Sequence, residues 1–147
     1  MRTVSKTVIG VDFGTESARA VLVNAENGEI IYSCRKEYPY NSTPVPAIDC
    51  AENLPCATDY EMTLYELLRN VIPEEYRKTV AGICVDATSL TMVLLAEDGR
   101  ALSELDGWSE AAHARVKLWK YHRAQEKADE ALNLARNLQE PFLGRTG

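Results

Sequence analysis

Polar residues that could bind a phosphate group gather in one short segment near the N-terminus. An apolar stretch of strand length, residues 7–13, leads directly into it. A tight turn after such a strand presents backbone amides to phosphate oxygens. A glycine lets the phosphate come close, hydroxyl side chains add donors, and an arginine adds a fixed positive charge. The residues that we predict to bind phosphate are Gly14, Thr15, Ser17 and Arg19.

Asp12 lies just before this turn, at the carboxyl end of the predicted strand. There its carboxylate is placed to hold a hydrated Mg²⁺ beside the phosphate, so Asp12 is our candidate metal ligand. On spacing alone, a purely structural interpretation has equal weight. In that interpretation, Asp12 caps a hairpin turn and Arg19 forms a surface ion pair. A P-loop is excluded because the chain has no Gly-x-x-x-x-Gly-Lys-Ser/Thr pattern.

A second polar turn follows another apolar stretch, residues 80–86. Ligands gather at the carboxyl ends of strands in an open sheet, so its side chains are placed to face the same cleft as Asp12. The residues concerned are Asp86, Thr88 and Ser89. On the residues alone we favour the simpler interpretation, a polar turn between two buried strands.

Local patterns predict the strands that would position these turns. The first three strands form an antiparallel meander, and Asn27-Gly28 is a strong hairpin signal before the third. A helix between the third and fourth strands implies a parallel crossover. The predicted strands are residues 7–13, 17–23, 29–34, 80–86, 91–96 and 116–120.

Two helices are also predicted. The first starts at Thr58, which forms a capping box with Glu61, and ends before Pro73. The second, residues 122–138, is rich in strong helix formers and has an apolar side. Several prolines make residues 38–55 an irregular surface excursion.

The composition narrows the class of protein. The chain has 147 residues and a net charge of −6, and 46% of its residues are hydrophobic, enough for a sizeable core. The acidic balance argues against general binding to nucleic acid or to an anionic membrane. No apolar run approaches the roughly 20 residues that span a bilayer, so we expect a cytoplasmic protein.

Cysteine and histidine add no predicted site. The four cysteines show no metal-ligand spacing, and we expect reduced structural thiols. The two histidines are too far apart for a helical metal pair, and we expect neither to be a ligand or a catalyst. These residues are Cys34, Cys50, Cys56, Cys84, His113 and His122.

Four segments together resemble the FGGY carbohydrate kinases. They occur in the order and approximate spacing of that family, and the last of them is most similar to the ribulokinase branch. The segments are residues 12–19, 82–89 and 96–99, and the stretch that begins Leu118-Trp119-Lys120. The resemblance covers nearly all of this chain and about the first quarter of such an enzyme.

The resemblance implies an α/β, ribonuclease H-like fold of the actin-like ATPase superfamily, with a mixed sheet and flanking helices. Residues 1–147 would be the N-terminal portion of the first, sugar-binding domain, with the rest of that domain and the second domain absent. It implies ATP and Mg²⁺ as cofactors, and it matches Asp12 to the metal position and the first turn to the phosphate site. It matches Ser89, Trp119 and Lys120 to the sugar side.

The family's catalytic base has no match in this chain, so we expect no catalytic residue here. The leading hypothesis is ATP-dependent phosphorylation of ribulose by a full-length parent, with these 147 residues inactive alone. One alternative is an FGGY kinase for xylulose, another ketose or a polyol. Another is a binding or scaffold module of the same fold, without catalysis. The expected partners are the sugar and ATP, with a possible homo-oligomer.

Overall fold

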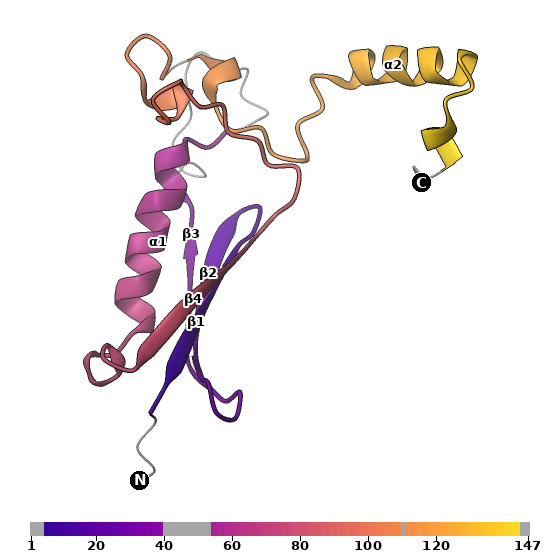
Figure 1. Cartoon of the computed structure of the whole chain (residues 1–147). Coiled ribbons are helices and arrows are strands. Elements are labelled where there is room, and N and C mark those ends of the chain that lie inside the picture. Colours follow the sequence, from indigo (N-terminus) through magenta and orange to yellow (C-terminus); the bar gives the residue numbers. More distant parts are fainter. Residues whose placement is uncertain (1–4, 40–53, 110, 145–147) are drawn as a thin grey trace.

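A mixed β-sheet forms the body of the molecule (Figure 1). The structure is a computed structural model that describes residues 5–39, 54–109 and 111–144. The strands are β1 (Thr7–Phe13), β2 (Ser17–Asn24), β3 (Ile30–Glu37) and β4 (Val80–Ala87), in the order β3-β2-β1-β4. β1, β2 and β3 pair antiparallel, whereas β4 runs parallel to β1. The predicted meander and parallel crossover are therefore confirmed.

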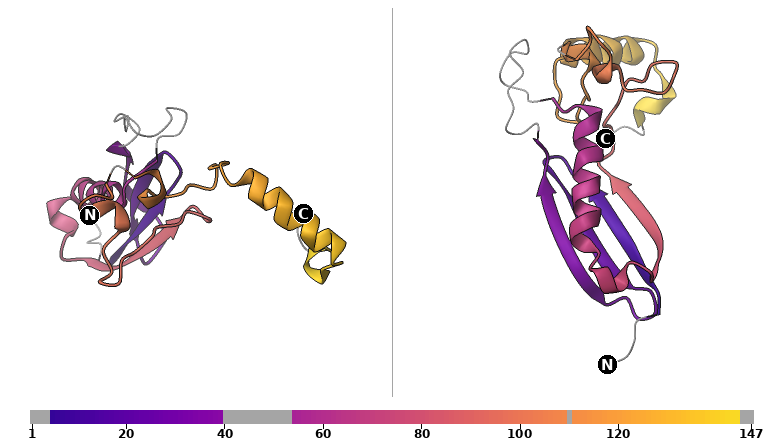
Figure 2. Two further views of the ribbon diagram at one scale, coloured as in Figure 1. Left: turned by 90° about the horizontal axis from the view of Figure 1, so that it is seen from above. Right: turned by 90° about the vertical axis from the view of Figure 1, so that its left-hand side faces the viewer.

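Helix α1 (Ala57–Val71) covers one face of this sheet, as the right-hand view of Figure 2 shows. The strands alternate apolar and polar positions, and their apolar side chains pack against the buried face of the helix. This gives the hydrophobic core, whose buried members are Ile9, Val11, Ala18, Ala20, Leu22, Tyr38, Leu67 and Val71. The opposite face of the sheet carries the alternate residues of each strand.

The start of α1 differs from the prediction. The helix is capped at Cys56, whose backbone N–H donates to Asp59 Oδ2 at 2.7 Å, so the predicted capping box of Thr58 and Glu61 is wrong. Contacts from distant residues explain the shift. The backbone N–H of Val116 donates to the carbonyl of the buried Pro55 at 3.0 Å, and an Arg115 guanidinium nitrogen donates to Cys56 Sγ. These contacts fix the chain one residue before the helix.

The predicted strands over 91–96 and 116–120 are wrong. Met92 and Lys117 form an isolated bridge, with two backbone hydrogen bonds of 3.1 Å, and Leu95 bridges Ala101. Leu90 has a φ of 58°, in the left-handed region, so the chain turns off the sheet before a strand can form. This region also contains short 3₁₀-helices at Leu102–Glu104 and Ala112–Ala114. One other 3₁₀-helix follows α1, at Glu74–Tyr76, and another ends the described chain, at Pro141–Gly144.

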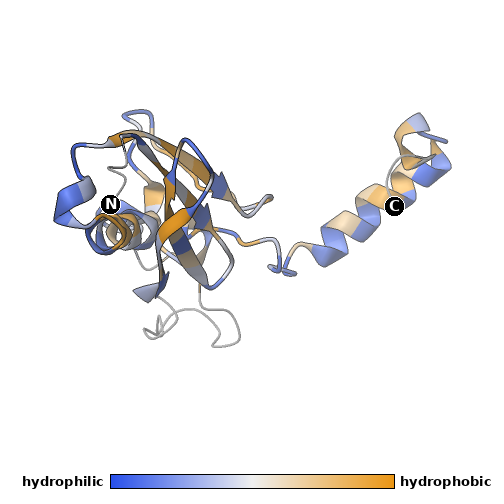
Figure 3. Ribbon diagram, turned by 90° about the horizontal axis from the view of Figure 1, so that it is seen from below, coloured by the Kyte–Doolittle hydropathy of each residue, from blue (hydrophilic) through white to orange (hydrophobic). Residues whose placement is uncertain are grey.

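Helix α2 (Gln125–Asn137) is shorter than the predicted 122–138 and extends away from the sheet (Figures 1 and 2). Its C-terminus is closed by Gln139, which has a φ of 54°, and by a hydrogen bond of 3.0 Å from the Glu140 N–H to the Ala135 carbonyl. Figure 3 shows apolar colour along α2 as well as in the sheet. Of the expected apolar side, only Ala135 is buried within the described residues.

Strand β4 is also more exposed than its sequence predicts. Ile83 and Val85 are 53% and 55% exposed, although their register partners Ile9 and Val11 are buried. The reason is that α1 packs on β2 and β3, so β4 lies uncovered at the edge of the sheet. Cys84 is exposed too, contrary to its expected structural role.

Two further expectations concern the cysteines and the excursion. Cys34, Cys56 and Cys84 are free thiols. Cys50, and most of the predicted excursion over 38–55, lie outside the described residues. Within the described chain, no helix has the length and apolar character needed to cross a membrane.

Candidate functional site

The open face of the sheet carries a row of charged residues at one level. Asp12 of β1 pairs with Arg19 of β2 on one side and with Asp86 of β4 on the other, and Arg19 pairs with Arg35 of β3. Paired positions project to the same face of a sheet, with Cβ atoms about 4.5–5.5 Å apart. The row therefore reads Arg35, Arg19, Asp12, Asp86, two cations followed by two carboxylates. Its Asp12, Arg19 and Asp86 line a shallow hollow of about 320 Å³.

This charge pattern suits a phosphate and its metal ion together. The arginine side attracts phosphate oxygens, and the carboxylate side offers the hard oxygen ligands that Mg²⁺ prefers. Two carboxylates leave room for water and phosphate oxygens in an octahedral shell. The described residues contain no group of three or more His, Cys, Asp or Glu side chains that could hold a metal by themselves.

The first turn is closely braced. The Gly14 N–H donates to the Ser17 carbonyl at 3.1 Å, and the Tyr38 hydroxyl donates to the Gly14 carbonyl at 3.0 Å. A Cβ at position 14 would lie 3.1 Å from the Ser17 carbonyl oxygen, so the facing backbone would have to shift by a few tenths of an ångström, and the close approach of the two strands favours a glycine there. Ser17 is buried, and its Oγ accepts a hydrogen bond of 2.9 Å from Arg35 Nε.

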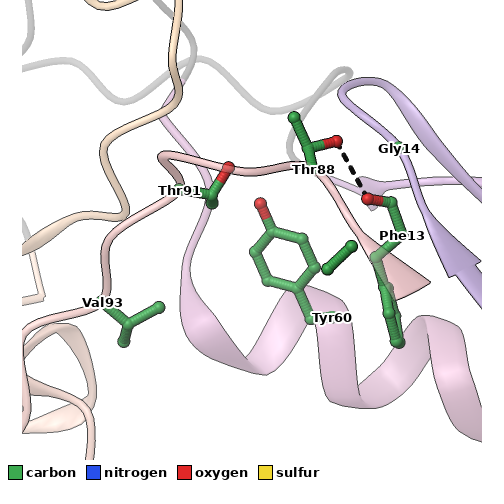
Figure 4. Close-up of a pocket in the computed structure, with 7 residues that line it drawn as sticks. Phe13, Gly14, Tyr60, Thr88, Thr91 and Val93 are labelled. Atoms are coloured by element: carbon green, nitrogen blue, oxygen red, sulfur yellow. Dashed lines mark hydrogen bonds between the residues drawn. The ribbon is translucent and has the colours of Figure 1, made fainter. Parts of the chain in front are cut away.

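A pocket lies beside this turn, where β1 and β4 end (Figure 4). It has a volume of about 230 Å³ and mixes apolar side chains with hydroxyl groups. The N–H and the Oγ1 of Thr88 both donate to the Phe13 carbonyl, at 2.9 and 3.0 Å, and so tie the second turn to β1. The pocket is lined by Phe13, Gly14, Tyr60, Ala87, Thr88, Thr91 and Val93.

Two hydroxyl groups of this pocket are shielded from water. Tyr60 rises from α1, with its ring between Thr88 and Thr91 in Figure 4. Burial, reinforced by the neighbouring Asp59 carboxylate, raises the pKa of Tyr60 to about 12. Thr91 Oγ1 is buried without a hydrogen-bond partner among the described residues. A hydroxyl-bearing ligand would give Thr91 Oγ1 a partner.

Trp119 contacts the first turn. Its Nε1 donates to Thr15 Oγ1 at 3.0 Å, across 104 residues of sequence. The residues on the N-terminal side of Trp119 are anchored, because Val116 and Leu118 are buried and Lys117 is bridged to Met92. The structure therefore brings together two residues that the sequence assigned to different halves of the site.

Two further predicted binding residues and the two histidines complete the site description. Ser89 follows Thr88 and is exposed, as is Lys120, which follows Trp119. His113 packs edge-on against Trp108, with ring centroids 5.3 Å apart, and His122 is exposed.

Asp86 and Tyr60 are not among the predicted binding residues. The sequence places Asp86 at the same cleft as Asp12 but favours the simpler interpretation of a polar turn. The signal that could have found it is the shared Val-Asp ending of the two strands, residues 11–12 and 85–86, because parallel pairing places these endings side by side. Tyr60 gave no signal beyond the apolar spacing of its helix.

Comparison with known proteins matches the chain to one part of larger enzymes. It is 39% identical over 126 residues to "Ribulokinase 1" of Staphylococcus saprophyticus, covering 82% of this chain and 23% of the relative. It is 33% identical over 151 residues to a ribulokinase of Halalkalibacterium halodurans and 34% identical over 152 residues to one of Mycolicibacterium smegmatis, each match covering 97% of this chain and 27% of the relative. The chain thus spans about a quarter of the length of these relatives. No family model matches it.

Solved structures show the same fold. A xylulose kinase from Lactobacillus acidophilus superposes with a TM-score of 0.60 at 18% identity, covering 91% of this chain and 24% of that one. A gluconate kinase from the same organism gives a TM-score of 0.59 at 18% identity, with the same coverage. The mixed sheet with its helices therefore matches part of the fold of these sugar kinases, which confirms the fold class expected from the sequence.

Proposed function

We propose that this chain, which is similar to the N-terminal part of ribulokinases of the FGGY carbohydrate kinases, supplies the phosphate-binding turn and one wall of the sugar pocket of an ATP-dependent sugar kinase. The observation that carries the proposal is the row of Arg19, Asp12 and Asp86 across three neighbouring strands. Phosphoryl transfer depends mainly on positioning and charge stabilisation, and this row places both signs of charge beside a hydroxyl-bearing turn.

The phosphate-binding residues act at the first turn. Arg19 contributes a guanidinium charge, and the hydroxyls of Thr15 and Ser17 donate to phosphate oxygens, while Gly14 permits the tight turn that aligns them. The hydrogen bond from Arg35 occupies a lone pair of Ser17 and leaves its hydroxyl proton to donate.

Asp12 is the proposed metal ligand, and Asp86 is placed to join it. Their carboxylates fit a hydrated Mg²⁺ because both are hard oxygen donors on one face at one level of the sheet. Bound Mg²⁺ would offset the negative charge of the transferring phosphate. The protein contributes the fixed position of the two carboxylates relative to Arg19.

The sugar is proposed to lie at the pocket between the two turns. Ser89 and Lys120 offer polar groups to its hydroxyls, and the exposed indole of Trp119 offers an apolar face to its C–H groups. The names of the relatives at 32–39% identity support ribulose as the substrate. A kinase that uses ATP and a soluble sugar would work in the cytoplasm.

A chimera tests this function. Residues 1–147 replace the matching N-terminal part of the Halalkalibacterium halodurans ribulokinase, and ADP release is measured with ribulose, xylulose and gluconate. We expect sugar-dependent ADP release that is fastest with ribulose. Faster turnover of another sugar would move the assignment to a different sugar kinase. A folded chimera without sugar-dependent ADP release would contradict the kinase function and favour a binding module.

A further inference from the structure

The two threonines that line the pocket beside the first turn differ in their hydrogen bonds. Thr88 donates through Oγ1 to the Phe13 carbonyl at 3.0 Å. Thr91 Oγ1 is buried and has no hydrogen-bond partner among the described residues. A buried hydroxyl group without a partner is costly, because it has lost its hydrogen bonds to water and gained none in the fold. In the lining of a pocket, such a group indicates a ligand that supplies the missing hydrogen bond.

The backbone on both sides of Thr91 is fixed. Leu90 has a φ of 58°, and this left-handed turn directs the chain off the sheet. Met92 then shares two backbone hydrogen bonds of 3.1 Å with Lys117. Threonine is also branched at Cβ, which restricts its χ1 angle. These constraints keep the Thr91 hydroxyl at the pocket.

The lining of the pocket is electrically neutral. Phe13, Ala87 and Val93 offer apolar surface, and Tyr60 keeps its proton because burial raises its pKa to about 12. None of the described lining residues carries a charge near neutral pH. A phosphate or a carboxylate would find no cation here to offset the cost of its burial. The pocket therefore suits a neutral ligand that combines apolar C–H surface with a hydroxyl group.

The size of the pocket limits how much of a ligand can enter. Its volume of about 230 Å³ is smaller than the roughly 300–1,000 Å³ of pockets that enclose drug-sized molecules. A few carbon atoms of a small molecule fit in this space.

We infer that this pocket binds one hydroxyl-bearing carbon of the sugar and that Thr91 recognises its hydroxyl group, which makes Thr91 a specificity-determining residue. This inference rests on the proposed function, because it takes the ligand of the pocket to be the sugar. Phe13 and Val93 contact the C–H groups, and Thr91 Oγ1 forms a hydrogen bond with the hydroxyl. A ligand without that hydroxyl leaves Thr91 buried and unpaired, and such a mismatch discriminates between ligands.

The state of Thr91 in the fold is tested by urea unfolding of the 147-residue chain without ligand. We expect Thr91→Val to have an unchanged or higher unfolding midpoint, because valine keeps the shape and removes an unpartnered hydroxyl. Thr88→Val is the matched control and should have a lower midpoint, because it loses the hydrogen bond to the Phe13 carbonyl. A lower midpoint in Thr91→Val would show that the fold itself uses this hydroxyl, and would overturn the inference.

The role in binding is tested by NMR titration of the same chain with ribulose and with ribulose analogues that each lack one hydroxyl group. The methyl signals of Thr88 and Val93 report occupancy of the pocket. We expect Thr91→Val to weaken ribulose binding by about fivefold, the factor for one hydrogen bond between neutral groups, and Thr91→Ser to retain the affinity. One analogue should bind equally to the wild type and to Thr91→Val, because it lacks the hydroxyl that Thr91 recognises.

The outcomes separate this inference from the kinase function. Equal ribulose affinity in the wild type and in Thr91→Val would overturn the inference and leave the kinase function standing. A loss of the same size for ribulose and for every analogue would also overturn it, since that pattern means a changed pocket shape. Failure of the wild-type chain to bind ribulose would overturn it as well, while ADP release by the chimera would still decide the kinase function.

Discussion

Replacing Asp12 by asparagine separates the proposed metal role from a structural one, because it deletes a charge and keeps the side-chain shape. In the folded chain, Asp12 lies between a cation, Arg19, and a carboxylate, Asp86. At cross-strand spacing of about 5 Å, each interaction is worth ~0.8 kcal/mol in water. The attraction and the repulsion nearly cancel. We therefore expect Asp12→Asn to change the free energy of unfolding by less than about 0.5 kcal/mol.

The same substitution should strongly reduce phosphoryl transfer. It removes one of the two carboxylate oxygen donors that fit Mg²⁺, at the place where phosphate charge must be neutralised. We expect turnover of the chimeric kinase to fall at least about a hundredfold, which corresponds to ~2.7 kcal/mol of activation free energy. A metal role thus predicts a large kinetic effect beside a small change in stability.

Two measurements check this expectation. Thermal unfolding of the 147-residue chain gives the stability change, and ADP release by the chimera at saturating ribulose gives turnover. Asp106→Asn is the matched control, since Asp106 is exposed and lies away from the row. Turnover of Asp12→Asn close to that of the control would refute the metal role. A large loss of stability would instead assign Asp12 to the fold.

Four other expectations follow from the structure. The isolated 147-residue chain should release no ADP with ribulose and ATP, because it has no matched catalytic base and spans about a quarter of the length of its relatives. A luminescent ADP assay checks this, with the chimera as positive control. In the chimera, Ser89→Leu should raise the apparent KM for ribulose and leave the KM for ATP nearly unchanged, and equal changes in steady-state kinetics would remove Ser89 from the sugar side. Tyr38→Phe should lower the free energy of unfolding by about 1 kcal/mol in urea titrations, because it deletes the hydrogen bond to the Gly14 carbonyl. An unchanged unfolding midpoint would show that this hydrogen bond does not stabilise the fold. Stability should fall between about pH 10 and 12, because the unfolded Tyr60 loses its proton there while the folded one keeps it, and Tyr60→Phe should flatten that part of the stability profile.

The strands of the meander could be predicted because their signals are local. Alternation of apolar residues gives each strand its buried face, and Asn27-Gly28 and the Gly14 turn mark where strands must end. Strand β4 was placed correctly from its apolar run, but its burial was not. An apolar run shows only that a strand can be covered. Whether it is covered depends on the position of α1, which packs on β2 and β3.

After β4, by contrast, local patterns predict strands that do not form. Residues 91–96 are apolar enough for a strand, yet Leu90 turns them away from the sheet and leaves only the bridges at Met92 and Leu95. The start of α1 was missed for a similar reason, since Cys56 is held by Arg115 from a distant part of the chain. Local patterns indicate which helices and strands can form, and contacts between distant segments determine which of them do form.

The sequence by itself determined the first turn and the polar residues it carries, because Asp12, Gly14, Thr15, Ser17 and Arg19 lie within eight consecutive residues of a strand and its hairpin. Tertiary structure alone decided what faces that turn. The register of β1 with β4 placed Asp86 beside Asp12, and a contact across 104 residues placed the Trp119 indole on Thr15. The sequence places Asp86 only at the same cleft as Asp12, and it gives no sign of the Trp119 contact. Strand register and side-chain contacts between distant segments depend on how the whole core packs.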